Sequence, residues 1–245
     1  MSIIKVNRKK LVEVCFSPNL YQLHKGDAEI VVVIDVLRAT SAICMAFQYG
    51  VKSIIPISTL EEAFEYKRKG FMVAAERDGQ VVEGFKFGNS PFSYMTKEIK
   101  GKTLVMTTTN GTKTINVARE AGTVVVGSLL NLDALSDWLI SQNKNTLLLC
   151  SGWKNKFNLE DTICAGAIAE KLLGSMKFQS SEDSSVAAKY LYLSAKENYL
   201  GYLKSSSHRS RLKALNLNKD VKFCLTPNQT NVVPILKNNE LVKVK

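Results

Sequence analysis

The fold is decided by Ile30-Val31-Val32-Val33-Ile34-Asp35-Val36-Leu37-Arg38-Ala39-Thr40, an apolar run that ends in charged residues. Five consecutive apolar residues predict a strand that is buried on both faces. A helical pattern over 40–49 follows at once. A buried strand followed by a helix is the repeating unit of a parallel α/β sheet, so this stretch favours that fold class.

The same alternation of apolar runs and helical patterns continues along most of the chain. We expect strands near 11–15, 30–35, 53–57, 71–75, 103–106, 123–126, 145–150, 221–225 and 231–236, and helices near 40–49, 60–69, 112–121, 132–142, 160–173, 184–203 and 207–215. Thr59 and Glu62 have the spacing of a capping box at the start of the second helix. The pattern predicts a layered α/β/α fold with a mixed, largely parallel sheet and a more helical C-terminal portion.

The length favours a single domain over residues 1–245. A Ser-rich and acidic stretch over 174–185 is typical of an exposed connector, which would divide the chain into sub-lobes 1–173 and 184–245. Two short strands about Asn238-Asn239 are expected to close the second sub-lobe.

Composition excludes several classes of protein. Hydrophobic residues make up 45% of the chain and charged residues 22%, which argues against wholesale disorder. No apolar run approaches the ~20 residues that cross a bilayer, and Met1–Lys10 leads into no apolar segment of a signal peptide. The five cysteines are an odd number without a Cys-x-x-Cys pair, which indicates reduced thiols. We therefore expect a cytoplasmic protein that does not enter a membrane.

The net charge of +11 is concentrated near the C-terminus. Residues 201–245 contain nine Lys and Arg against only Asp220 and Glu240, a balance of +7. Such a basic end can bind nucleic acid, an acidic membrane surface or a small polyanion, and it can also be a solvated helix face.

Polar residues follow the predicted strands at the point where each one ends. They are Asp35 with Arg38, Glu76 with Arg77, the run Thr107–Thr112, Gly127 with Ser128, and Ser151 with Gly152. Because ligands of open α/β sheets bind at the carboxyl ends of parallel strands, these segments predict one binding crevice.

One part of this crevice is predicted to bind an anion. Hydroxyls, an amide and a glycine lead directly into a helix N-terminus, where free N–H groups favour negative charge; the residues are Thr108, Thr109, Asn110, Gly111 and Thr112. The same residues could simply cap a helix. The neighbouring Arg38 and Arg77 favour binding of a phosphate or sulfonate, and Ser151 and Gly152 are further candidates for substrate contact.

Another part is predicted to hold a divalent metal. Asp35 ends an apolar strand, where a carboxylate is costly unless it is paired, hydrogen-bonded or metal-bound. It could form an ion pair with Arg38, or it could bind Mg²⁺ with Glu76 and the Glu160-Asp161 pair as further donors. Because Mg²⁺ usually takes one or two protein carboxylates, not all of these can be ligands.

The sequence lacks residues that several known phosphatase chemistries require. Leu37 stands where a haloacid-dehalogenase type enzyme needs a second Asp, Lys156 stands where a Cys150 phosphatase loop needs Arg, and there is no Gly-x-Ser-x-Gly elbow. His208 lies among Ser205, Ser206, Arg209 and Arg211, unlike a buried core histidine. A surface histidine and a general acid both remain open for it.

Five segments carry a resemblance to a known family: Ile34–Ser41, Ala75-Glu76-Arg77, Gly84-Phe85-x-x-Gly88-Asn89-Ser90-Pro91, Thr107–Thr112, and Leu159–Thr162 with Ala165–Ile168. In order and spacing they resemble the 2-phosphosulfolactate phosphatase family, from Val12 to about Ile235. The resemblance implies Mg²⁺-dependent hydrolysis of (R)-2-phospho-3-sulfolactate to 3-sulfolactate and phosphate, a step of coenzyme M biosynthesis.

These residues suggest a mechanism for a small phosphorylated sulfonate or carboxylate. Asp35 and Glu76, with Asp161 as a third candidate, would hold Mg²⁺. Arg38 would stabilise phosphoryl charge, and His208 would protonate the leaving oxygen. Either water or Asp35 would attack phosphorus. A non-catalytic binding protein for a phosphorylated metabolite and a nucleic-acid-binding protein are the alternatives; we expect no nucleic-acid partner, and a homo-oligomer is left open.

Overall fold

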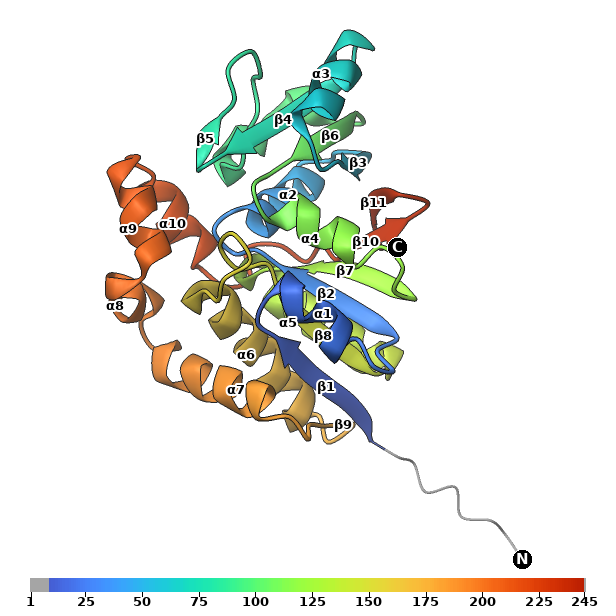
Figure 1. The fold of residues 1–245 in the computed structure, drawn as a ribbon, viewed down its shortest axis with the longest axis vertical. Helices are drawn as coiled ribbons and strands as arrows, with labels where there is room; N and C mark the ends of the chain where they lie inside the picture. Colours follow the sequence, from blue (N-terminus) through green and yellow to red (C-terminus); the bar gives the residue numbers. More distant parts are fainter. Residues whose placement is uncertain (1–8, 245) are drawn as a thin grey trace, which may run out of the picture.

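The computed structural model describes residues 9–244 and shows one mixed, mostly parallel sheet flanked by helices, as Figure 1 shows. Residues 1–8, which include most of the basic N-terminal segment considered above, and Lys245 lie outside the described part. The strands are β1 Lys10–Cys15, β2 Ile30–Ile34, β3 Ser53–Pro56, β4 Met72–Arg77, β5 Gln80–Val81, β6 Thr103–Thr107, β7 Thr123–Gly127, β8 Thr146–Cys150, β9 Phe178–Gln179, β10 Pro234–Lys237 and β11 Glu240–Lys243. The predicted α/β/α class is confirmed.

The strands follow the order β5-β4-β6-β3-β11-β10-β7-β2-β8-β1-β9. Strands β4, β6 and β3 form one parallel block, and β7, β2, β8, β1 and β9 form a second. The C-terminal hairpin β10–β11 lies between the blocks and pairs antiparallel with β7 on one side and β3 on the other. Its turn is Asn238-Asn239, both at positive φ, as a two-residue hairpin turn requires. The two predicted closing strands are thus confirmed, and they join the sheet.

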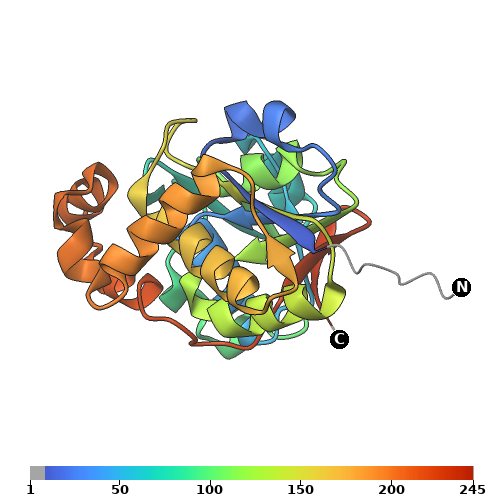
Figure 2. The same cartoon turned by 90° about the horizontal axis from the view of Figure 1, so that it is seen from below.

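Ten helices are found in the described part of the chain. They are α1 Tyr21–His24, α2 Ala39–Gln48, α3 Leu60–Arg68, α4 Gly111–Val117, α5 Leu132–Gln142, α6 Leu159–Gly174, α7 Asp183–Ala195, α8 Tyr199–Tyr202, α9 Ser207–Ala214 and α10 Asn218–Cys224. The predicted capping box of Thr59 and Glu62 begins α3. Figure 2 shows helices on both faces of the sheet.

The burial of strand β2 on both faces explains why its sequence is apolar throughout. Ile30, Val32 and Ile34 pack into the core with α5 and α6, whereas Val31 and Val33 pack into the core beneath α2 and α4. Alternate side chains of a strand point to opposite faces, so a strand covered by helices on both sides needs apolar residues at every position.

Three predictions about the C-terminal portion are wrong in detail. Residues 221–225, expected as a strand, belong mostly to α10, whose buried Val221 and Cys224 lie three residues apart on one helix face. The helix expected over 184–203 is interrupted: α7 ends at Ala195, and Asn198 caps α8. The expected connector contains β9, which pairs with β1 and buries Phe178. The division into sub-lobes remains a prediction.

The strands of both blocks run toward the side of the molecule where α8, α9 and α10 lie (Figure 1). The loops that follow β2, β4, β6 and β8 therefore meet the C-terminal helices at this side. Within residues 9–244 no helix has both the length and the apolar character needed to span a membrane.

Candidate functional site

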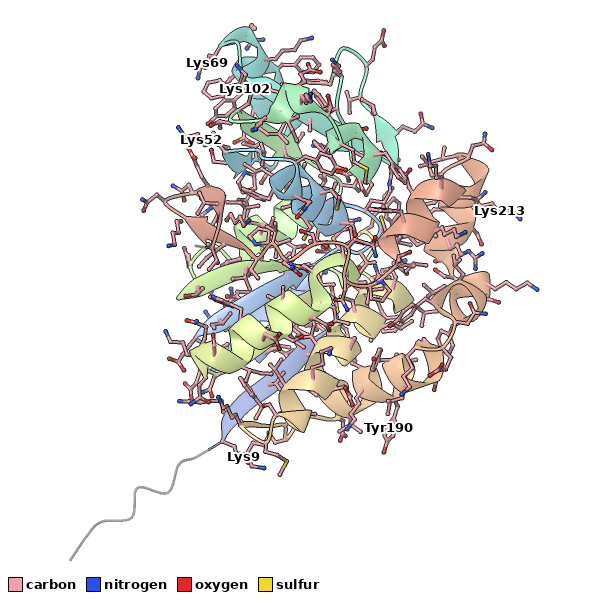
Figure 3. All side chains as sticks on the ribbon, turned by 180° about the vertical axis from the view of Figure 1, so that it is seen from behind. Lys9, Lys52, Lys69, Lys102, Tyr190 and Lys213 are labelled. Carbon is pink, nitrogen blue, oxygen red and sulfur yellow. The ribbon has the colours of Figure 1, made fainter. Side chains whose placement is uncertain are left out.

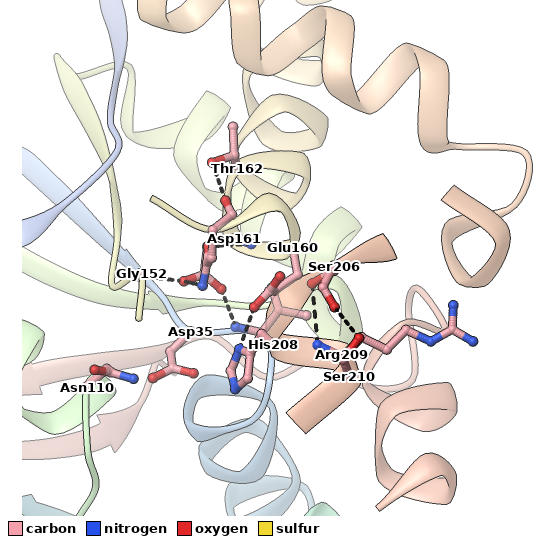
Figure 4. A network of polar contacts seen from close by, with 12 residues as sticks. Asp35, Asn110, Gly152, Glu160, Asp161, Thr162, Ser206, His208, Arg209 and Ser210 are labelled. Atoms are coloured by element: carbon pink, nitrogen blue, oxygen red, sulfur yellow. Dashed lines mark hydrogen bonds and ion pairs between the residues drawn. The ribbon is translucent and has the colours of Figure 1, made fainter. Parts of the chain in front are cut away.

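A small pocket lies where the carboxyl ends of the strands meet α9. Its lining comes from β4, from the loops after β2, β4, β5, β6 and β8, and from helix α9. It comprises Asp35, Leu37, Arg38, Glu76, Gly79, Asn89, Thr109, Asn110, Trp153, His208 and Leu212. We call this the catalytic pocket. Figure 4 shows Asp35 beside the imidazole of His208, with Asn110 on its other side.

Asp35 is buried directly after β2. Its backbone N–H donates to Thr40 Oγ1 at 3.0 Å, and its Oδ1 accepts from the Ala39 N–H at 3.3 Å. No donor in residues 9–244 bonds Oδ2. Burial, followed by the nearby carboxylate of Asp161, raises the pKa of Asp35 to about 8, although His208 opposes this shift. The carboxylate is therefore held in place with one oxygen free, and burial and nearby carboxylates outweigh the effect of His208 on its pKa.

Gly111 lies against Asp35 at the start of α4. A Cβ at this position would lie 2.5 Å from Ala39 Cβ and 2.9 Å from Asp35 Oδ2. Because real Cβ contacts are longer, only glycine allows α4 to approach this closely. Gly111 therefore has a role in packing, and its predicted contact with the substrate stays a prediction.

Asp161 connects three segments around the pocket. Its Oδ1 accepts from the Val36 N–H at 2.8 Å, and its Oδ2 accepts from the Gly152 N–H and from Asn158 Nδ2 at 3.0 and 2.9 Å. Burial, and then the adjacent Glu160, raise its pKa as well. Asp161 was predicted to bind the metal. In this structure the three donors occupy most of the acceptor positions of its carboxylate.

Glu76 is even more fully bonded. Gly79 N–H and the Thr109 hydroxyl donate to its Oε1, and Asn89 Nδ2 and the Thr109 N–H donate to its Oε2. A carboxylate has about four acceptor positions, so this arrangement leaves none for a cation. In this structure Glu76 positions three loops, and its predicted metal role stays a prediction.

The donor set of the pocket nevertheless fits one Mg²⁺ ion. Asn89 Oδ1 is buried with no hydrogen-bond partner in the described residues, and it lines the pocket with the free Oδ2 of Asp35. Mg²⁺ takes one or two protein oxygens and keeps several waters. Within residues 9–244 no three His, Cys, Asp or Glu side chains form a group that could hold a metal ion.

Arg38 forms a buried ion pair that the sequence did not suggest. Its Nη1 lies 2.5 Å from Asp220 Oδ2 of α10, and its Nη2 donates to Gly79 O at 2.6 Å. The alternative pairing with Asp35 is absent among the described contacts. Two of the five N–H donors are used, so the guanidinium can still donate into the pocket.

His208 is buried, contrary to the surface position that its neighbours in sequence favoured. Its Nδ1 lies 2.5 Å from Glu160 Oε1, as Figure 4 shows. Trp153 packs on the imidazole at 5.1 Å between ring centroids, and Arg211 lies over the Trp153 ring at 4.3 Å. Glu160 therefore fixes Nδ1 and leaves Nε2 for the pocket.

In the run Thr107–Thr112, which begins with the last residue of β6, Thr108 and Thr112 form hydrogen bonds with each other. The Thr108 N–H donates to Thr112 Oγ1 at 2.9 Å, and the Thr112 N–H donates to Thr108 Oγ1 at 3.0 Å. Thr108 therefore satisfies one N–H in the first turn of α4, whose N-cap residue Asn110 makes no capping bond with its side chain. The predicted substrate contact of Thr108 and Thr112 stays a prediction. Thr109 and Asn110 line the pocket, and Asn110 Oδ1 accepts from the Lys154 N–H at 3.1 Å.

Three other predicted substrate contacts lie outside the pocket lining. Arg77 follows Glu76 on the opposite side of β4 and donates to Thr107 Oγ1 and to the backbone oxygen of Glu76. Gly152 gives its N–H to Asp161 and has a φ of 63°, which favours glycine. Ser151 is buried beside the neighbouring cavity described below.

The sequence interpretation missed the roles of four residues in or beside the pocket. Asn89 and Trp153 line the pocket, Glu160 pairs with His208, and Asp220 pairs with Arg38. Asn89 lies in one of the segments that carry the family resemblance, and Asp220 is one of only two acidic residues in the basic region 201–245. Both features could have marked these residues as candidates. The pairings themselves depend on tertiary contacts.

Comparisons with known proteins indicate the family of the chain. A family model described as 2-phosphosulpholactate phosphatase matches residues 15–239. A probable 2-phosphosulfolactate phosphatase of Caldanaerobacter subterraneus subsp. tengcongensis is 42% identical over 212 residues, covering 85% of this chain and 88% of the relative. One of Thermotoga maritima is 40% identical over 211 residues, covering 86% and 90%. One of Clostridium perfringens is 34% identical over 240 residues, covering 96% of each chain.

Proposed function

The chain belongs to the 2-phosphosulfolactate phosphatase family, and from this membership we propose that it hydrolyses 2-phospho-3-sulfolactate to 3-sulfolactate and phosphate with the help of Mg²⁺. The observation that carries the proposal is the pairing of two groups in one pocket. Asp35 offers a free carboxylate oxygen, and His208 offers Nε2 while Glu160 holds its Nδ1. Such a pair suits hydrolysis of a phosphomonoester, which needs charge neutralisation at phosphorus and a proton for the leaving oxygen.

Asp35 and the carbonyl oxygen of Asn89 would hold the metal. When bound, Mg²⁺ neutralises charge on the phosphoryl oxygens and orients the substrate. A cation there would also compensate the buried carboxylates of Asp35 and Asp161, whose pKa values are raised by burial and by neighbouring carboxylates. Glu76 and Asp161 would act indirectly, because they fix the loops that carry Asn89, Thr109, Val36 and Gly152.

His208 would be the general acid. The Glu160 carboxylate would accept a hydrogen bond from Nδ1–H and stabilise the imidazolium, so Nε2–H can donate to the alkoxide as it leaves. Arg38 would donate to the phosphoryl oxygens with the N–H groups that Asp220 and Gly79 do not use. The attacking group, either water or Asp35, remains open.

A phosphate-release assay tests this function. Purified protein is incubated with small phosphomonoesters that carry sulfonate, carboxylate or neither, with and without Mg²⁺. We expect release from 2-phospho-3-sulfolactate that depends on Mg²⁺ and is lost in EDTA. Tight binding of this ester without release of phosphate would favour the alternative of a non-catalytic binding protein.

The physiological setting follows from the same proposal. The product would enter coenzyme M biosynthesis in the cytoplasm. The protein would have no nucleic-acid partner, because part of the basic excess serves the fold: Arg209 donates to Leu200 O and Arg211 stacks on Trp153. Nonspecific DNA binding depends on many free phosphate contacts and falls steeply with salt. Submicromolar affinity for duplex DNA at physiological salt would contradict this part of the proposal.

A further inference from the structure

A second cavity, of about 310 Å³, borders the catalytic pocket. Thr109 and Asn110 line both, so these residues form the boundary between them. The hydrogen bond from the Lys154 N–H to Asn110 Oδ1 connects the boundary to the loop after β8. We call this space the side cavity.

The side cavity contains a buried hydroxyl without a partner. Ser151 is 1% exposed, and its N–H donates to Ile34 O at 2.8 Å, which fixes the residue at the end of β8. Its Oγ has no hydrogen-bond partner within the described chain, although the residue lines the cavity. A buried hydroxyl left unbonded costs free energy, so this position suits a group that would be bonded by a ligand.

The charged side chains of the side cavity are all basic. Lys113 of α4 and Lys154 line it, and no Asp or Glu does. Lys113 forms no ion pair in the described part of the structure. Lys154 pairs with Asp78 at 3.2 Å, but both side chains are well exposed, so the pair is weak. The side cavity is thus cationic, whereas the catalytic pocket beside it is rich in carboxylates.

We propose that the side cavity binds the sulfonate of the substrate while its phosphate lies in the catalytic pocket. This inference rests on the proposed function and adds a determinant of specificity to it. A sulfonate has three acceptor oxygens and full negative charge, which match the Ser151 hydroxyl and the ammonium groups of Lys113 and Lys154. A substrate with its phosphate and sulfonate on adjacent carbons is short enough to place the two groups on either side of Asn110. Binding energy from this non-reacting end would select sulfonated esters through a lower KM.

Matched substrates and variants test the assignment. Lys113→Gln keeps most of the length but removes the charge, and Ser151→Ala removes the hydroxyl. Each is assayed with 2-phospho-3-sulfolactate and with 2-phospholactate, which has a methyl group in place of the sulfonate-bearing carbon. Loss of one charge-assisted hydrogen bond should raise KM for the sulfonated ester by about tenfold or more. KM for 2-phospholactate and kcat for both esters should change by less than about twofold.

Lys52→Gln is the control. Lys52 is an exposed lysine just before β3, at the other end of the strands, and is labelled in Figure 3. It should leave both esters unaffected. Equal increases of KM for the two esters in Lys113→Gln and Ser151→Ala, or no increase, would overturn the assignment.

A binding measurement separates failure of this inference from failure of the proposed function. Calorimetry with 3-sulfolactate and with lactate needs no turnover. We expect the wild-type protein to bind 3-sulfolactate more tightly than lactate, and Lys113→Gln to remove most of that difference. If phosphate is released from neither ester but this preference holds, the proposed activity fails and the sulfonate site stands. If wild type shows no preference, the sulfonate site fails whatever the activity.

Discussion

Arg38 Nη1 lies 2.5 Å from Asp220 Oδ2, and both side chains are almost completely buried, at 4% and 8% exposure. The two residues are 182 positions apart in sequence. The pair attaches α10 to the loop after β2, and the bond from Glu160 to His208 attaches α9 to α6 in the same region. Helix α9 therefore lines the pocket, and buried polar contacts fix the positions of α9 and α10 beside it.

Asp220→Asn should destabilise the protein by about 3 kcal/mol, because removal of one partner leaves a buried charge uncompensated. Urea unfolding measures this as a lower midpoint at an unchanged slope. The matched control is Glu98→Gln, which breaks the exposed pair with Lys86 and should cost less than about 1 kcal/mol. Equal effects of the two substitutions would show that burial does not set the strength of the Arg38 pair.

Glu160→Gln and His208→Ala should both lower kcat for an alkyl phosphomonoester, with a loss of roughly 10²–10⁴ for His208→Ala. The losses should be much smaller for an aryl phosphate, because an aryl oxide leaves without protonation. The measurement is the ratio of kcat values for the two esters in each variant. A loss that is the same for both esters would assign His208 to binding or to structure.

Gly111→Ala should reduce activity through the position of Asp35. The added methyl group would meet Ala39 Cβ at 2.5 Å and Asp35 Oδ2 at 2.9 Å, so α4 or the carboxylate must shift. Overpacking of this kind costs about 1–3 kcal/mol. We expect a lower melting temperature and weaker Mg²⁺ binding by calorimetry.

Gly174→Ala is the control for this substitution, because a Cβ at Gly174 meets no atom within 4 Å. It should change the free energy of unfolding by less than about 1 kcal/mol and leave Mg²⁺ affinity unchanged. If Gly111→Ala behaves in the same way, the close packing of α4 against Asp35 has no consequence for the metal.

The sequence was sufficient for those features that depend on local patterns. The apolar run of β2 predicted a strand buried on both faces, and polar residues at strand ends predicted the location of the pocket, because these features follow from periodicity and the direction of parallel strands. The helix α10 was missed because its apolar residues Val221, Phe223, Cys224 and Leu225 are too close together to distinguish a helix from a strand.

The roles of individual carboxylates could not be read from the sequence. Glu76, a predicted metal ligand, accepts hydrogen bonds from Gly79, Asn89 and Thr109 and so positions three loops. Glu160 was expected only as a further metal donor, yet His208 of a distant helix pairs with it. Both outcomes depend on which segments meet in three dimensions, and local pattern carries no information about that.

The raised pKa of Asp35 gives a prediction about pH and Mg²⁺. Burial and nearby carboxylates raise this pKa from 3.8 to about 8 in the metal-free folded protein, so the folded state retains a proton that the unfolded chain loses near pH 4. Between these values the folded state binds more protons than the unfolded state, so the free energy of unfolding should fall as pH rises. Mg²⁺ binds the deprotonated carboxylate and should reverse this loss, so the increase in melting temperature on adding Mg²⁺ should be larger at about pH 8 than at about pH 5.

Asp35→Asn tests both halves of that argument in one variant. The amide keeps the shape of the side chain but can neither titrate nor neutralise a cation, so the variant should stay folded, lose nearly all phosphate release and bind Mg²⁺ far more weakly. In EDTA its melting temperature should fall less between about pH 5 and 8 than that of wild type, because one of the buried carboxyls no longer releases a proton; Asp161 keeps part of the dependence. Retained turnover with unchanged Mg²⁺ affinity would remove Asp35 from the site. A wild-type protein that becomes more stable in EDTA as pH rises over this range would instead show that Asp35 is already paired with a cationic group, and the metal would then have no uncompensated charge to neutralise.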